Sequence, residues 1–282
     1  MQSSQIEPRA NTLKVPGATL YYEVQGSGPV LLMIPGGPAD AGIFTALAGL
    51  MAESYTTVRY DPRGNSRSVL DAYPQDQDMD RHGDDAQQLL ALFGDEPAFV
   101  LGSSGGAQIG LNLAARHSGR VGTLIAHEPP CIQLLPDAEQ NQRFTNDVAE
   151  AYRSSGAGAA MQRFLAVTGI GAGRKPENAA PTPPELRESY GRMQGNLDYF
   201  FAHGFKPISL FVPDIARLRA GTTRIVVGVG ETSAGQVAHR TGLALAERLG
   251  NQPVTFPGGH GGYNDCPAEF ADKLREVLSG SA

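Results

Sequence analysis

The chain of 282 residues has no tryptophan, only two cysteines and no long hydrophobic run. Two cysteines are too few for a disulfide scaffold, which excludes a small disulfide-rich secreted domain. No apolar stretch approaches the roughly 18 residues needed to cross a bilayer. The opening, Met1 to Asn11, is polar and lacks the apolar stretch of a signal peptide. We therefore expect a soluble, cytoplasmic protein with free thiols.

Positive charge is also scarce, because 23 lysines and arginines face 29 aspartates and glutamates, for a net charge of −6. This balance offers no attractive field to nucleic acid or to an anionic membrane, so we expect neither as a partner. Hydrophobic residues make up 41% and charged residues 18% of the chain, which excludes intrinsic disorder for most of it. The length suits one large α/β domain or two small ones.

Strand and helix patterns alternate along the first half of the chain. Two strands, Thr12–Val15 and Ala18–Gln25, read as an opening hairpin, and Val30–Ile34 is a continuous apolar run, typical of a strand buried on both faces. Further strands and helices alternate up to Val121–Ala126, and the alternation returns from Arg224–Val229 onwards. This order predicts an α/β fold with a mostly parallel sheet covered by helices.

The stretch between these two parts shows helical patterns and no clear buried strand. Helices are expected over Asp137–Ser154, Ala159–Val167 and Glu185–His203. We interpret residues 132–216 as an inserted helical cap. Residues 1–131 and 217–282 then form the α/β core.

The segment Gly102–Gly106 matches the pattern G-x-S-x-G with Ser104 at its centre. It follows a short apolar strand and precedes a helix, which is the setting that this motif needs. A strained turn there lifts the hydroxyl off the sheet at the N-terminus of a helix, whose dipole favours developing negative charge. Ser104 is therefore the candidate nucleophile.

His260 is the candidate base, because it lies in a glycine-rich loop after the last predicted strand. Such a loop can bring an imidazole above the strand ends to take the proton of Ser104. The other helix-associated histidines are expected at the surface: His82, His117, His203 and His239. No pair of histidines has metal-ligand spacing supported by carboxylates, so we predict no metal.

The order of elements, the Ser104 turn, the turn at Asp61–Gly64 and the late His260 together resemble the α/β-hydrolase fold. The resemblance covers nearly the whole chain. It implies a central sheet of about eight strands, flanking helices and a Ser–acid–His triad. Most members carry the acid after the strand that corresponds to Arg224–Val229, but that position holds Ser233 here. Either Glu231 or Glu128, at the end of the preceding core strand, is then the acid.

A narrower resemblance favours Glu128. The segments Ser103–Gly105 and His127–Pro130 are similar to those of the lactonases that open the macrocyclic ester of zearalenone, whose triad acid corresponds to Glu128. Those lactonases place a cap tryptophan against the substrate, whereas this chain has none. The resemblance therefore implies cleavage of an ester or lactone without implying zearalenone as the substrate.

Acyl transfer also needs hydrogen-bond donors for the developing oxyanion. One donor is expected to be the amide of Gly105, directly after the nucleophile. The other should come from the loop Pro35–Pro38, where the prolines have no N–H group to donate. Alignment with the lactonases implies Gly37 rather than Gly36. Residues expected to line the pocket are Gly36, Cys131, Tyr190, Met193, Leu197, Tyr199, Phe200 and Phe201.

These residues predict a cofactor-free serine hydrolase acting on a small-molecule ester or lactone, with Ser104 as nucleophile, His260 as base and Glu128 as acid. Haloalkane dehalogenases and epoxide hydrolases of the fold that this chain resembles use an aspartate as nucleophile, so Ser104 argues against both chemistries. Two alternatives stay open: a ligand-binding protein of low turnover on the same fold, and a lyase or cofactor-free oxygenase using the serine and histidine. The oligomeric state stays open as well, with a homodimer as one option.

Overall fold

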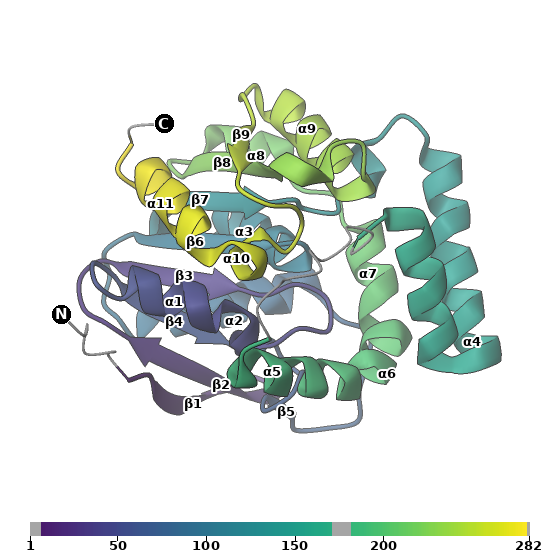
Figure 1. The fold of residues 1–282 in the computed structure, drawn as a ribbon, viewed down its shortest axis with the longest axis horizontal. Helices are drawn as coiled ribbons and strands as arrows, with labels where there is room; N and C mark the ends of the chain where they lie inside the picture. The colour runs from purple at the N-terminus through teal and green to yellow at the C-terminus, as the bar shows by residue number, and fades with distance from the viewer. Residues whose placement is uncertain (1–6, 171–181, 281–282) are drawn as a thin grey trace.

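A computed structural model describes residues 7–170 and 182–280 (Figure 1). Its strands form one nine-stranded sheet of order β1-β2-β4-β3-β6-β7-β8-β9, with β5 paired to β2. The strands are β1 (Arg9–Val15), β2 (Ala18–Gln25), β3 (Val30–Ile34), β4 (Thr56–Tyr60), β5 (Val69–Leu70), β6 (Ala98–Ser103), β7 (Val121–His127), β8 (Arg224–Gly230) and β9 (Val254–Phe256).

From β4 to β9 every neighbouring pair in the sheet is parallel, whereas β1 and β2 form an antiparallel hairpin at one edge. The apolar run Val30–Ile34 is β3, inside the sheet, and four of its five residues are buried. Because helices cover both faces of the sheet, a central strand such as β3 is apolar throughout and does not alternate between apolar and polar residues. The predicted fold class is therefore confirmed.

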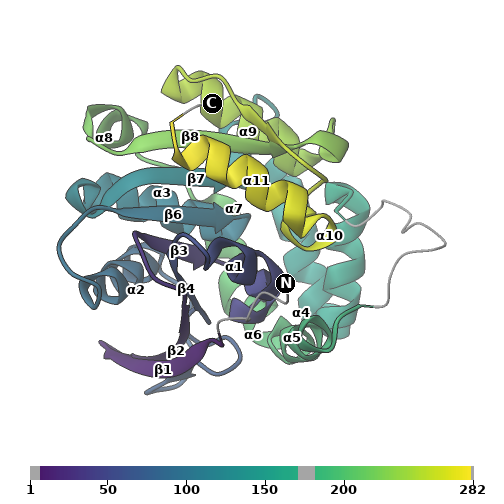
Figure 2. The same ribbon diagram turned by 60° about the vertical axis from the view of Figure 1, so that its left-hand side comes forward.

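The main helices divide between the two faces of the sheet (Figures 1 and 2). On one face α1 and α11 contribute Leu47 and Leu274 to a common core, and on the other α2, α3, α8 and α9 contribute Leu89, Leu111, Leu218 and Leu245. The helices of these layers are α1 (Thr45–Met51), α2 (Met79–Ala91), α3 (Gly105–Arg116), α8 (Ile215–Ala220), α9 (Val237–Leu249), α10 (Gly262–Asp265) and α11 (Pro267–Leu278). Within residues 7–170 and 182–280, no helix has the length and hydropathy of a membrane span.

Four further helices between β7 and β8 gather beyond the carboxyl ends of the central strands, at the right and lower centre of Figure 1. They are α4 (Ala138–Thr168), α5 (Pro184–Gly195), α6 (Leu197–Tyr199) and α7 (Phe205–Leu210). They have an apolar cluster of their own, which includes Val148, Phe200, Phe201 and Phe205. The two helices expected before residue 168 are the two segments of α4, which meet at a kink at Gly156, whose φ of 81° is not helical.

Candidate active site

Ser104 lies between β6 and α3 with φ 56° and ψ −127°, a backbone that side chains rarely adopt. Its amide donates to the carbonyl of His127 over 2.9 Å, which ties the turn to β7. The strand and helix meet closely on either side. A Cβ atom on Gly102 would lie 2.4 Å from the carbonyl oxygen of Gly106, and one on Gly106 only 2.0 Å from that of Ile34. Glycine is therefore required at both positions if the turn is to present Ser104 at the helix N-terminus.

Glu128 follows β7 directly, is fully buried and also has a positive φ of 46°. Its Oε2 accepts a hydrogen bond from Nδ1 of His260 over 2.7 Å. Its Oε1 accepts from the Gly230 amide over 2.9 Å and from the Ser233 hydroxyl. Burial alone would raise the pKa of Glu128, but the hydrogen bond and charge of His260, together with His127 and the Ser233 hydroxyl, outweigh it and lower that pKa to about 2. The carboxylate is therefore ionised at neutral pH.

Ser233 and Glu231 lie after β8, where most members of the fold that this chain resembles carry the triad acid. Ser233 is fully buried and donates to Glu128. Glu231 is exposed, and the carboxylate that bonds His260 is that of Glu128. Sequence reasoning missed this use of Ser233. The signal was its place at the usual acid position, where a small donor supports a carboxylate supplied by the neighbouring strand.

His260 lies in the loop after β9, and 14% of its side chain is exposed. Because Nδ1 donates to Glu128, Nε2 is the basic nitrogen of the ring. Ser104, Glu128 and His260 follow the carboxyl ends of β6, β7 and β9, which lie within four neighbouring strands of the sheet. Among the described residues, Ser104 Oγ makes no hydrogen bond to His260. Such bonds often form only when substrate binds.

The amides of Gly105 and Gly37 lie beside each other. A Cβ atom on Gly105 would lie 3.2 Å from the nitrogen of Gly37, and one on Gly36 would lie 2.6 Å from Cβ of Ser104. No acceptor within the described part of the chain takes a hydrogen bond from either amide. Two neighbouring free donors next to a serine hydroxyl can hold an oxyanion.

The model of the alpha/beta hydrolase fold family matches residues 29–199. The chain belongs to the α/β-hydrolase family. It is 36% identical over 273 residues to the uncharacterized hydrolase YraK of Bacillus subtilis, and the match covers 95% of each protein.

Solved structures of other α/β hydrolases share the fold. A thermophilic esterase from Thermogutta terrifontis has a TM-score of 0.73 at 20% identity, over 97% of this chain and 98% of that one. A hydrolase from Pseudomonas aeruginosa has a TM-score of 0.67 at 22% identity, over 95% and 98%. At this level of identity the likeness concerns the fold alone.

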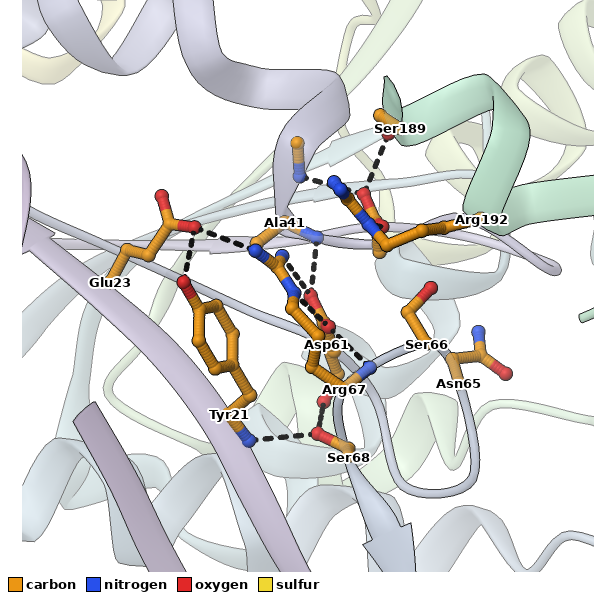
Figure 3. A network of polar contacts seen from close by, with 12 residues as sticks. Tyr21, Glu23, Ala41, Asp61, Asn65, Ser66, Arg67, Ser68, Ser189 and Arg192 are labelled. Carbon is orange, nitrogen blue, oxygen red and sulfur yellow. Dashed lines mark hydrogen bonds and ion pairs between the residues drawn. The ribbon is translucent and has the colours of Figure 1, made fainter. Parts of the chain in front are cut away.

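In this α/β hydrolase the helix α5 is fastened to the loop that carries Gly37. Ser189 donates to Asp40 over 2.6 Å, and Arg192 pairs with the same carboxylate, which is fully buried (Figure 3). Asn196 donates to the carbonyl of Pro38 and to the hydroxyl of Ser66, each over 2.8 Å. The continuous helix expected over residues 185–203 is interrupted at this asparagine.

Figure 3 also shows the contacts of Asp61, which lies in the turn after β4 that resembles the α/β-hydrolase fold. Asp61, fully buried, accepts from the amide of Ala41 over 2.9 Å and from Nε of Arg67 over 2.8 Å. Asn65 donates to the carbonyl oxygens of Gly37 and Ala39 over 3.1 and 3.0 Å. The turn after β4 therefore holds the loop after β3 in place.

The residues expected to line the pocket are only partly brought together. Gly36 lies against Ser104, and the Phe200 ring is 3.7 Å from a Cβ built on Gly37. Leu197 and Phe201 pack with Phe200 in the cluster of the cap helices. Met193 instead packs against the core under α1 and α11, and Cys131 is buried in the core on the opposite face. The ring of Tyr199 lies against Gly64, and Tyr190 is half-buried.

The expectation that His82 lies at the surface is wrong, because only 1% of it is exposed. It shares one face of α2 with Ala86 and Leu89, four and seven residues further on, and both are buried. This helical spacing was the signal in the sequence that predicted burial. His82 lines a small cavity together with Gly37 and Gly105. Within the described residues, no cluster of histidine, cysteine and carboxylate side chains could hold a metal ion.

Proposed function

We propose that this α/β hydrolase is a serine hydrolase that cleaves carboxylic esters or lactones of small molecules without a cofactor. The observation that carries the proposal is the hydrogen bond between the buried Glu128 carboxylate and His260. It orients an imidazole in the loop after β9, in the same group of neighbouring strands as β6, which Ser104 follows. The narrower likeness to zearalenone lactonases is part of the same proposal.

In the proposed reaction Ser104 Oγ attacks the substrate carbonyl while Nε2 of His260 takes its proton. Glu128 keeps His260 in the tautomer with Nδ1 protonated and stabilises the imidazolium that forms. The amides of Gly105 and Gly37 donate to the oxyanion. His260 then protonates the leaving alkoxide, and an acyl-enzyme remains on Ser104. Water, activated by the same histidine, releases the acid.

The test is covalent labelling by a fluorophosphonate together with turnover of p-nitrophenyl acetate and a panel of lactones. We expect wild-type protein to lose its activity as one equivalent of probe is bound at Ser104. Ser104→Ala should neither bind the probe nor turn over any substrate. Ser103→Ala is the matched control, because it removes the neighbouring hydroxyl and should leave labelling intact.

Two outcomes would contradict the proposal. If activity persisted after complete modification of Ser104, the chemistry would not pass through an acyl-serine. If the wild-type protein bound esters and lactones with one-to-one stoichiometry but released no product, it would be a binding protein rather than an enzyme.

A further inference from the structure

A small cavity lies beside the two amides proposed to hold the oxyanion. Its volume is about 10 Å³, and its lining includes Gly37, Gly105, Asn65 and His82. The other walls are largely apolar, with Met79, Ile109 and Ile208 among them. This volume holds about one water molecule or one small substituent. A group bound there would lie next to the carbonyl that Ser104 attacks.

Asn65 provides the first unpaired acceptor at this cavity. Its Nδ2 donates to the carbonyl oxygens of Gly37 and Ala39, and these two bonds determine which way the amide faces. Its Oδ1 is buried and has no partner among the described residues. Leaving a buried acceptor unpaired is costly, so a ligand that supplies a donor there binds more tightly than one that does not.

His82 provides the second unpaired acceptor at this cavity. Its Nε2 lies 3.1 Å from the amide oxygen of Gln77, and since that oxygen can only accept, Nε2 carries the proton. Nδ1 is then a bare acceptor, and within the described part of the chain it has no partner. Burial, helped by the charge of Arg63, lowers the pKa of His82 to about 3, so the ring stays neutral.

The position of the cavity relative to His260 tells which part of an ester it takes. The leaving oxygen must lie close to His260, because that residue gives it a proton. The lining of the cavity includes neither His260 nor any other residue of its loop. The cavity is therefore on the acyl side of the bond that breaks.

We propose that this cavity is a subsite for a hydroxyl group on a short acyl chain, which donates its one hydrogen to Nδ1 of His82, beside Asn65. The unpaired atoms of the two side chains are both acceptors, and the free amides of Gly37 and Gly105 in the same lining are taken by the oxyanion in the proposed reaction, so a group bound here must bring a hydrogen. The volume admits a single small polar group. The inference rests on the proposed function and narrows its substrates to esters or lactones of short hydroxy acids. A hydrophobic acyl group of the same size would leave both acceptors unpaired.

The experiment compares phenyl hydroxyacetate with phenyl propionate, which have the same leaving group and acyl chains of nearly the same shape. Each kcat/KM is divided by the rate of hydroxide-catalysed hydrolysis of the same ester, which removes the intrinsic effect of the hydroxyl group. We expect this corrected ratio to favour hydroxyacetate by tenfold or more in the wild-type protein.

Two variants of His82 separate the subsite from a structural role. His82→Gln keeps a polar group near the place of Nε2 but removes the one at Nδ1, and His82→Asn can present an amide oxygen near Nδ1. We expect the corrected ratio to fall close to one in His82→Gln and to be largely retained in His82→Asn. The ratio is measured within one sample, so it does not depend on how much of a variant folds.

The outcomes separate the two proposals. If wild-type protein cleaves neither these esters nor the lactones, the proposed function fails, and the subsite fails with it. If both esters are cleaved with a corrected ratio near one, or if the ratio is the same in both variants, the cavity holds a water only. In that case the proposed function as a serine hydrolase stands, and the proposed subsite is overturned.

Discussion

Three residues other than glycine have a left-handed backbone in the described part of the chain: Ser66, Ser104 and Glu128. Such conformations cost about 1–3 kcal/mol each and persist only where the surroundings enforce them. Ser104 and Glu128 are the proposed nucleophile and acid. Ser66 is bonded through its amide and hydroxyl to Asn196, which also holds the loop of Gly37. At the scale of single residues, backbone strain is concentrated around the candidate site.

The role of Glu128 can be tested at this scale. We expect Glu128→Gln to lower kcat by about 10⁴-fold, because an amide at this place favours the wrong tautomer of His260. Far-UV and near-UV circular dichroism of the variant should match the wild type, and steady-state kinetics with p-nitrophenyl acetate measure the loss. Glu231→Gln is the matched control and should keep its activity. The reverse result, with only Glu231→Gln inactive, would transfer the acid to Glu231.

The buried His127, next to Glu128 in the chain, makes stability depend on pH. Burial lowers the pKa of His127 to about 4 from an ordinary value of 6.5. The charge of Glu128 opposes this shift, and the charge of His260 adds to it. Between these pH values the unfolded chain binds a proton that the folded protein does not, so stability falls as the pH falls. The loss by pH 4.5 amounts to about 2–3 kcal/mol.

Urea unfolding at pH 7 and pH 4.5 measures this loss. The comparison variant is His127→Phe, which keeps an aromatic ring among Phe256, Tyr263 and Phe270 and cannot titrate. We expect the free energy of unfolding of the variant to fall less between the two pH values, by about 2–3 kcal/mol. Equal falls in the two proteins would show that His127 does not contribute.

At the scale of elements, the turn between β6 and α3 depends on the contact of two backbones. We expect Gly106→Ala to lower the free energy of unfolding by about 3 kcal/mol or more, since the new methyl group would lie 2.0 Å from the carbonyl oxygen of Ile34. Gly119→Ala is the matched control, because a Cβ there meets nothing within 4 Å and should change stability by less than about 0.5 kcal/mol. Chemical denaturation of both variants decides the matter, and a mild effect at Gly106 would contradict this geometry.

At the scale of the whole molecule, the apolar residues form separate groups. One cluster lies on each face of the sheet, and a third, smaller one belongs to the cap helices. Ile208 packs against both the cap cluster and the core of one sheet face. Met193 of α5 packs against the core on the other sheet face, and polar bonds such as those of Asp40 and Asn196 add to these contacts. Small apolar groups open more readily than a large core, so the cap should be the less stable part.

Phe205 tests this division. It is 3% exposed, and its ring lies within about 6 Å of those of Phe144, Phe164 and Phe201. We expect Phe205→Ala to destabilise the cap by about 3–5 kcal/mol. Hydrogen exchange followed by mass spectrometry should show faster exchange in α4 and α7, with β6 and β7 as protected as in the wild type. Equal acceleration in the sheet would mean that cap and core unfold together.

The sequence predicted those features that depend on local patterns. A continuous apolar run such as Val30–Ile34 indicates a strand inside a covered sheet wherever it lies in the chain. The glycines around Ser104 indicate a tight turn because only glycine allows such close contact of strand and helix. The α/β fold followed from the order of such elements, and the family from the resemblance of that order together with the Ser104 turn, the turn at Asp61–Gly64 and the late His260. Both are confirmed.

The tertiary structure alone decided which distant groups meet. Ser233 and Glu128 are 105 positions apart, and only the pairing of β7 with β8 brings the hydroxyl to the carboxylate. In the folded chain it is the carboxylate of Glu128 that bonds His260, whereas the sequence could separate Glu128 from Glu231 only by resemblance. For His82 the spacing to Ala86 and Leu89 indicated the inward face of α2, but only the packing against that helix decides whether a polar ring on it is buried. Local patterns are determined by neighbours along the chain, whereas a site is determined by neighbours across the sheet.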